Sequence, residues 1–175
     1  MPAATQRRNA STLRRQHITI TNRQRIRTVD SYFLRRIIKT LIDELQIGQA
    51  DLAIHLVTTA EITRLNETFL HHAGSTDVIT FDYSDSALPY AQPATLLHGE
   101  IFVCVEEAIT QARRFHTTWQ TELVRYAIHG TLHLLGFDDS NPAARRKMKR
   151  AEDRWLRILS LRFLLTRLAR GRVAR

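Results

Sequence analysis

Two kinds of hydrophobic spacing follow one another along the chain and predict its secondary structure. The segment 17–22, HITITN, alternates apolar and polar residues, as a half-buried strand does. From Asp30 or Ser31, either of which could cap a helix, apolar residues recur at every third or fourth position instead. By these criteria strands are expected at 17–22, 51–58, 78–83 and 100–105. Helices are expected from 31 to a stop near Gly48, at 59–69, 106–114 and 118–135, and from about 142 to as far as 168.

The order of these elements predicts the class of fold. Short helical crossovers separate the early strands, and helices gather toward the end of the sequence. We therefore expect an α+β fold: a single domain with a mixed, roughly four-stranded sheet and helices packed on it, or the closely related open α/β sandwich. A length of 175 residues is enough for one domain, or one domain with tails. Two of the four prolines, Pro89 and Pro93, fall in 87–99, which predicts a loop there.

Composition excludes several classes of protein. Hydrophobic residues make up 43% of the chain and charged residues 25%, as in ordinary globular proteins, and the low counts of 6 Gly and 4 Pro exclude collagen-like and low-complexity sequences. The single cysteine, Cys104, leaves no internal disulfide partner and suits a reducing compartment. No apolar run approaches the roughly 18 residues of a membrane span, so we expect no membrane insertion. The basic start lacks the apolar stretch of a signal peptide, although an Arg-rich start is also found in organelle transit peptides.

Charge is concentrated at the two ends of the sequence. Residues 1–29 and 154–175 each hold seven arginines and no acid, whereas residues 30–153 hold 12 basic and 17 acidic side chains. Basic ends of this kind bind polyanions or anionic lipid, or are simply solvated tails. We expect a disordered basic tail at 1–15, a folded domain at 16–160 and a basic extension at 161–175.

The segment 125–139, RYAIHGTLHLLGFDD, contains a metal-ligand pattern. His129 and His133 are four residues apart on the expected helix, so both imidazoles lie on one face about one turn apart. Gly136 lets the chain leave the helix, and Asp139 can then return toward the same point. Two imidazoles and one carboxylate with an open position are typical of catalytic zinc sites, although iron and manganese also accept this set. A histidine pair at this spacing is also common for purely structural reasons.

The neighbouring residues favour one chemistry over another. Metzincin proteases share this ligand spacing but carry a general-base Glu directly after the first His, where this chain has Gly130. A glycine cannot accept a proton, so a peptidase is disfavoured. Five basic residues follow the motif, and near a metal site they would contact phosphates, unless they only solvate a helix face. These candidates for RNA binding are Arg145, Arg146, Lys147, Lys149 and Arg150. The few aromatic residues do not interleave with them, which disfavours base stacking of the OB or RRM kind.

Four blocks of sequence, in order, resemble the YbeY family of bacterial rRNA maturation factors. HGTLHLLGFDD resembles the family signature HGxLHLxGYDH. The other blocks are Leu65, Asn66 and Phe69 followed by TDVITF; GEIFVCVEEA at 99–108; and Met148 with Glu152. Together they span about residues 50–155.

The resemblance implies a single-domain α+β fold with a cleft that holds one Zn²⁺ per chain. It also implies a metal-dependent endoribonuclease that prefers single strands and acts in 3′-end maturation of small-subunit rRNA and in ribosome quality control. The implied partners are rRNA, the small ribosomal subunit, a ribosomal protein and an assembly GTPase, and the implied location is the cytoplasm. A non-catalytic RNA-binding assembly factor with a structural or vestigial metal site is the alternative, and a zinc hydrolase of another substrate is a weaker one.

The chain departs from the family pattern at two positions. The third ligand is commonly His, and here it is Asp139, with Asp138 beside it as an alternative ligand or a partner of a ligand. Leu70 replaces a functional arginine, and Arg64, His71 and His72 are the candidates to substitute for it. Our candidates for catalysis are His129, His133, Asp139 and, as a carboxylate, Glu100, although its position favours a solvated strand end. Our candidates for support of the cleft are Asn66, Asp77, Arg125 and Asp138, of which Asp77 could equally be a turn residue.

Overall fold

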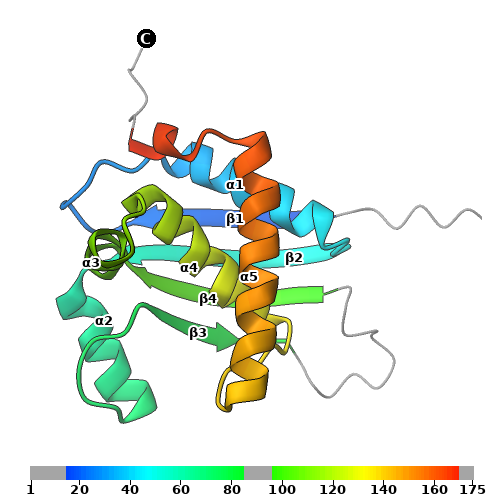
Figure 1. Cartoon of the computed structure of the whole chain (residues 1–175). Coiled ribbons are helices and arrows are strands. Elements are labelled where there is room, and N and C mark those ends of the chain that lie inside the picture. Colours follow the sequence, from blue (N-terminus) through cyan, green and yellow to red (C-terminus); the bar gives the residue numbers. More distant parts are fainter. Residues whose placement is uncertain (1–14, 85–95, 170–175) are drawn as a thin grey trace, which may run out of the picture.

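A four-stranded mixed sheet forms the centre of the fold in the computed structural model, which describes residues 15–84 and 96–169 (Figure 1). The strand order is β1-β2-β4-β3; β1, β2 and β4 are parallel, and β3 runs antiparallel to β4. The strands are β1 (Arg15–Asn22), β2 (Gln49–Val57), β3 (Val78–Asp82) and β4 (Leu96–Cys104). The helices are α1 (Ser31–Glu44), α2 (Thr59–Leu65), the π-helix η1 (Asn66–Leu70), α3 (Val105–Phe115), α4 (Trp119–Leu134), α5 (Pro142–Arg162) and the 3-10 helix η2 (Leu165–Ala169). The expected α+β class, with a mixed four-stranded sheet in one domain, is confirmed.

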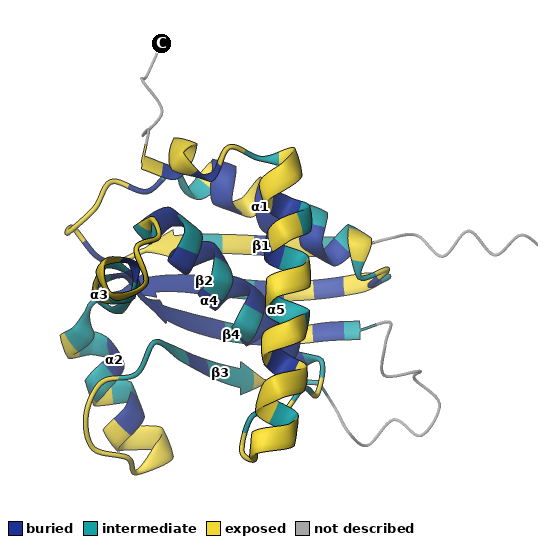
Figure 2. Ribbon diagram, viewed as in Figure 1, coloured by how far each residue is buried: buried dark blue, intermediate teal, exposed yellow. Residues whose placement is uncertain are grey.

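The helices cover the two faces of the sheet unequally. On one face α1, α4 and α5 enclose the main hydrophobic core, which contains fully buried Ile37, Ile54, Ile101 and Ile128 (Figure 1). On the other face a smaller cluster of five buried residues includes Ile62 of α2. Figure 2 shows the central strands as mostly buried and the outer surface of α5 as mostly exposed. The site described below lies on the face that carries the main core, where α4 packs between the sheet and α5.

Side-chain caps set the start of each long helix. Asp30 accepts a hydrogen bond from the backbone N–H of Phe33, and Thr118 accepts one from Thr121. Asn141 caps α5 through two N–H groups, with a proline at the first helical position, where the missing N–H costs nothing. These caps place α4 and α5 within one residue of the starts that the sequence predicts.

The structure differs from the expected elements near residues 96 and 162. β4 begins at Leu96, so the last four residues of the expected loop 87–99 pair with β2 instead, while 87–95 lie outside the described residues. The last helix ends at Arg162, because Phe163 is extended and η2 then buries Leu165 and Leu168 in the main core. Residues 1–14 and 170–175, which hold most of the expected basic tails, also lie outside the described part. None of the described helices is long and apolar enough to cross a membrane.

Candidate metal centre and cleft

The last two turns of α4 bring the two motif histidines together. The Nε2 atoms of His129 and His133 are 3.0 Å apart, and an oxygen of Asp139 lies 3.8 Å from each of them. These three residues form a group of potential metal ligands whose ligand atoms lie within 4.8 Å of one another. The spacing argument thus predicted the convergence correctly.

A tight turn after α4 returns the chain to the histidines. Gly136 has a φ of +82°, in the left-handed region that favours glycine, and so reverses the chain directly after the helix. The carbonyl oxygen of Phe137 then accepts a hydrogen bond from Nδ1 of His133 at 3.0 Å. The same turn that brings Asp139 back to the cluster therefore also orients one of the two imidazoles.

His129 is oriented by a carboxylate from α5. Nδ1 of His129 lies 2.8 Å from Oε1 of Glu152, whose side chain is only 12% exposed. Burial acts to lower the pKa of His129, but the hydrogen bond and charge of Glu152, helped by Asp77 and Asp139, outweigh it and raise that pKa above its ordinary value. Glu152 thus favours the Nδ1–H tautomer and leaves the Nε2 lone pair directed at the cluster.

The donor set fits a divalent cation. Nδ1 of each histidine faces an oxygen that can only accept, so in the neutral rings both Nε2 atoms present lone pairs to one another. Two lone pairs 3.0 Å apart, with a carboxylate 3.8 Å away, repel unless a cation lies among them. Nitrogens bound tetrahedrally to one zinc ion lie about 3.3 Å apart, close to the spacing found here. The residues present therefore fit the metal that the motif predicts.

The cluster lies at one side of a cleft of about 440 Å³ between α3, α4 and α5. Its charged lining comprises Asp77, Glu122, Arg125, Asp139, Arg145, Lys149, Glu152 and Asp153. Five carboxylates against three basic groups leave the lining formally negative with its histidines neutral, which also favours a bound cation.

Arg125 is held at the centre of a carboxylate network. It donates to Asp153 at 2.6 Å and lies 3.4 Å from Glu122 and 3.7 Å from Glu152. Its guanidinium therefore links the carboxylate that orients His129 to two further acids. The expectation that Arg125 supports the cleft stays a prediction, and its position in the lining agrees with it.

The other supporting candidates take different positions. Asp77 lines the cleft, and its carboxylate also accepts hydrogen bonds from the N–H of Val78 and the hydroxyl of Thr76, as a turn residue does. Asn66 is buried and donates to the carbonyl of Gly74, so it holds the loop before β3 rather than lining the cleft. Asp138 is not part of the metal-ligand group.

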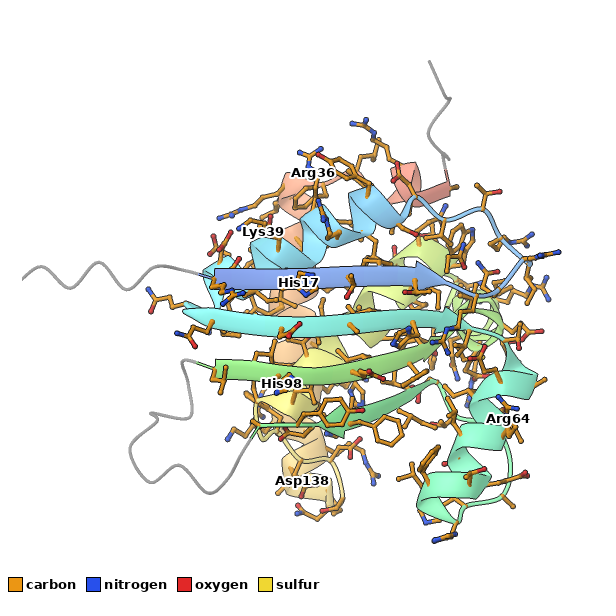
Figure 3. All side chains as sticks on the ribbon, turned by 180° about the vertical axis from the view of Figure 1, so that it is seen from behind. His17, Arg36, Lys39, Arg64, His98 and Asp138 are labelled. Carbon is orange, nitrogen blue, oxygen red and sulfur yellow. The ribbon has the colours of Figure 1, made fainter. Side chains whose placement is uncertain are left out.

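Asp138 accepts hydrogen bonds from both the hydroxyl and the N–H of Ser140, and these bonds lower its pKa. Of the two neighbouring aspartates, the metal-ligand group contains Asp139 and not Asp138. Figure 3 shows Asp138 in the turn beside the start of α5.

Glu100 does not join the site. Side chains alternate between the faces of a strand, and Ile101 packs under α4 while Glu100 faces the opposite side of the sheet. There Glu100 lies 3.6 Å from Nε2 of His55 and is absent from the described lining of the cleft. The expectation of a catalytic carboxylate at this position thus conflicts with the fold, because the sheet separates Glu100 from the histidines.

The residue after the first histidine packs into the core. A Cβ atom on Gly130 would lie 2.6 Å from Cγ2 of Ile101 and 3.2 Å from Cγ1 of Val78. Any side chain at 130 would therefore point into the sheet and away from the cleft. Position 130 lacks a metzincin-type base and also has no room for one.

The basic cluster divides between two surfaces. Arg145 and Lys149 line the cleft, whereas Arg146, Lys147 and Arg150 are exposed elsewhere on α5. Lys147 lies over the ring of Phe137, 5.2 Å from its centre. Only two of the five candidates for RNA binding thus line the cleft that holds the metal cluster.

The residues considered as substitutes for the family arginine lie away from the described lining of the cleft. Leu70 is 43% exposed at the end of η1, and neither it nor Arg64, His71 or His72 lines the cleft. Figure 3 shows Arg64 on α2, well separated from the turn that carries Asp138. The basic groups in the cleft come from α4 and α5 instead.

Three residues of the cleft acquire a role only from the structure. Glu152 was part of a family block, but nothing in its sequence context indicated that it contacts His129. Tyr126 precedes His129 by one helical turn, a spacing that could have placed it on the same face of α4. Gln111 comes from α3, and no sequence signal relates it to the motif.

Fold and site together define a class: a single-domain α+β protein in which a helical histidine pair and a turn carboxylate form a potential metal site within a cleft. Comparison with known proteins agrees with this class and also identifies the family. The family model Endoribonuclease YbeY matches residues 19–160. The chain belongs to the YbeY family.

Individual relatives agree. Endoribonuclease YbeY of Salinibacter ruber is 32% identical over 131 residues, which cover 74% of this chain and 83% of that protein. Endoribonuclease YbeY of Chlorobium phaeovibrioides is 42% identical over 96 residues, covering 55% and 60% respectively. The solution structure of TM1509 from Thermotoga maritima aligns with a TM-score of 0.58 at 26% identity, covering 83% of this chain and 90% of that one.

Proposed function

We propose that the chain is a zinc-dependent endoribonuclease that cleaves single-stranded RNA. The observation that carries the proposal is the His129–His133–Asp139 cluster in a cleft bordered by Arg145 and Lys149, in a member of a family named for endoribonuclease activity. A cleft that combines a potential cation site with basic side chains can hold a phosphodiester, whose negative charge both features attract.

Different residues of the chain would bind the metal, orient its ligands and bind the RNA. His129, His133 and Asp139 would hold the zinc ion. Hydrogen bonds from Nδ1 to Glu152 and to the Phe137 carbonyl hold the two imidazole rings in their orientation. When bound there, zinc supplies Lewis-acid chemistry that offsets charge at the scissile phosphate. Arg145 and Lys149 orient the strand across the cluster through its phosphates.

The substrate and partners follow from the family. We propose small-subunit rRNA, at its 3′ end, as the RNA that is matured, with a further role in ribosome quality control in the cytoplasm. The small subunit, a ribosomal protein and an assembly GTPase are the corresponding partners. The basic residues on the outer surface of α5 support contact with a large RNA, because they extend beyond the two basic groups of the cleft.

A single experiment tests the activity. Zinc-loaded wild type and the His133→Ala variant are incubated with a labelled single-stranded RNA and with a duplex of the same sequence, and products are resolved on a gel. We expect cleavage of the single strand that is lost in the variant. Metal content by elemental mass spectrometry, measured on the same samples, should give one zinc per chain in wild type only.

The alternative is a non-catalytic assembly factor that binds rRNA. Leu70, in place of the family arginine and outside the described lining of the cleft, is the observation that favours it. Wild type that binds RNA yet never cuts it above the level of His133→Ala would establish this alternative and reject the nuclease.

A further inference from the structure

The cleft contains two buried polar groups for which the described residues provide no partner. The hydroxyl of Tyr126 and Oε1 of Gln111 are both buried, and neither forms a hydrogen bond within the described part of the chain. The Tyr126 side chain belongs to a residue that is only 6% exposed. Buried polar groups are nearly always hydrogen-bonded in folded proteins, so two in one cleft indicate a partner from outside the described residues.

The chemistry of these two groups restricts that ligand. Nε2 of Gln111 donates to Glu107, which fixes the amide and leaves Oε1, on a residue that lines the cleft, as an acceptor without a partner in the described fold. The Tyr126 hydroxyl can donate. A phosphate offers only acceptors, so it cannot satisfy Gln111, whereas the polar edge of a nucleobase offers N–H donors next to acceptors.

An exposed aromatic ring lies at the same cleft. Phe115, at the end of α3, is 60% exposed and is part of the lining with Gln111 and Tyr126. An exposed phenyl ring costs free energy in water and provides a face on which an unpaired base can stack.

We propose that Tyr126, Gln111 and Phe115 form a nucleobase-binding subsite that takes one unpaired base of the RNA beside the metal cluster. The proposal rests on the proposed function in that it takes RNA as the ligand. Tyr126 lies three residues before His129, roughly 4.5 Å along the axis of α4, so a base held there belongs to a nucleotide next to the phosphate at the cluster. A base in a duplex is stacked and paired and cannot enter, which gives a physical basis for a preference for single strands.

Binding of short RNAs with and without one base tests the subsite. Fluorescence anisotropy is measured with the full chain in chelator, which keeps the RNA intact, on a five-nucleotide RNA and on versions with an abasic site at each position in turn. We expect one position at which loss of the base weakens binding roughly 5- to 150-fold, the range for a stacked base. Tyr126→Phe should weaken binding of the intact RNA about 2- to 10-fold, as loss of one hydrogen bond does.

Combining base removal with the protein variants shows whether Tyr126 and Phe115 contact the base. At the sensitive position, abasic RNA should bind equally well to wild type, Tyr126→Phe and Phe115→Ala, because the base that these side chains contact is gone. The matched control is Tyr83→Phe, which makes the same chemical change on a tyrosine outside the described lining of the cleft. Tyr83 directly follows β3, is 49% exposed and contacts the ring of His98 on β4. This control should bind every RNA as wild type does.

The thermal stability of the variants excludes a merely structural role. The Tyr126 hydroxyl has no partner in the described fold, so Tyr126→Phe should melt at the same temperature as wild type or higher while it loses affinity for RNA. A flat abasic scan, or equal losses on intact and abasic RNA, would overturn the subsite. So would sensitivity to 2′-deoxy substitution without sensitivity to base removal, which assigns the two groups to a ribose. Cleavage of RNA by wild type is scored separately, so the subsite can fail while the nuclease stands, and the reverse.

Discussion

Removal of the Glu152 carboxylate should weaken metal binding through His129 rather than through a lost ligand. Glu152 is absent from the ligand group, yet its oxygen lies 2.8 Å from Nδ1 of His129 and its side chain is largely shielded from water. Loss of such a partner typically lowers metal affinity about 10- to 100-fold, equivalent to roughly 1.4 to 2.8 kcal/mol. We expect Glu152→Gln near the lower figure, because its amide oxygen still accepts from Nδ1, and Glu152→Ala near the upper one.

The assay is a competition titration of zinc against a chromophoric chelator at about pH 8. This pH lies above the ordinary histidine pKa of about 6.5, and competition between protons and the metal weakens as the pH rises. At lower pH a second effect should appear. Glu152 raises the pKa of His129, so the zinc affinity of wild type should fall more steeply with decreasing pH than that of Glu152→Gln.

Glu67→Gln is the matched control, since it removes the same charge from an exposed position on η1. It should bind zinc as wild type does. If both Glu152 variants bind zinc within twofold of wild type at this pH, the carboxylate does not orient the ligand and the reasoning is refuted.

Three further predictions concern packing, ligand identity and RNA contact. Gly130→Ala should lower the free energy of unfolding by about 1 to 2 kcal/mol, because overpacking against Ile101 exceeds the gain in helix propensity. A chemical denaturation curve measures this change, and an unchanged midpoint would contradict the prediction. Asp139→Ala should lose most of its bound zinc while Asp138→Ala retains it, as elemental analysis after dialysis would show; the reverse result would identify the other aspartate as the ligand. Arg150→Glu should weaken binding of a long RNA and make its salt dependence shallower by roughly one phosphate contact or more, whereas equal salt slopes would remove the outer face of α5 from the interface.

Local patterns predicted most of the secondary structure, because the caps and apolar spacings that define each element lie within it. Asp30 and Thr118 are examples, since each caps the helix that directly follows it. The start of β4 was missed because Leu96 and Leu97 become a strand only by pairing with Gln49 and Ala50, which are distant in sequence. The end of α5 was missed for a similar reason, because burial of Leu165 and Leu168 in the main core competes with further helix.

The same distinction applies to the site. His129, His133 and Asp139 lie on one helix and its following turn, so their convergence is a local property that spacing can predict. Glu152 and Gln111 reach the cleft from α5 and α3, and only the packing of helices decides that they face it. Glu100 failed as a candidate because a strand presents neighbouring residues to opposite faces, and the sequence does not state which face the helix covers.

The contact between η2 and the start of α1 has a consequence for how the molecule folds as it is synthesised. The N–H of Asp30 donates to the carbonyl of Leu168 at 2.9 Å, and the ring of Phe163 packs edge-on against Phe33. The first helix therefore completes its packing only with residues that are translated 130 or more positions later. A ribosome stalled before residue 163 would therefore carry a nascent chain in which α1 lacks both of these contacts.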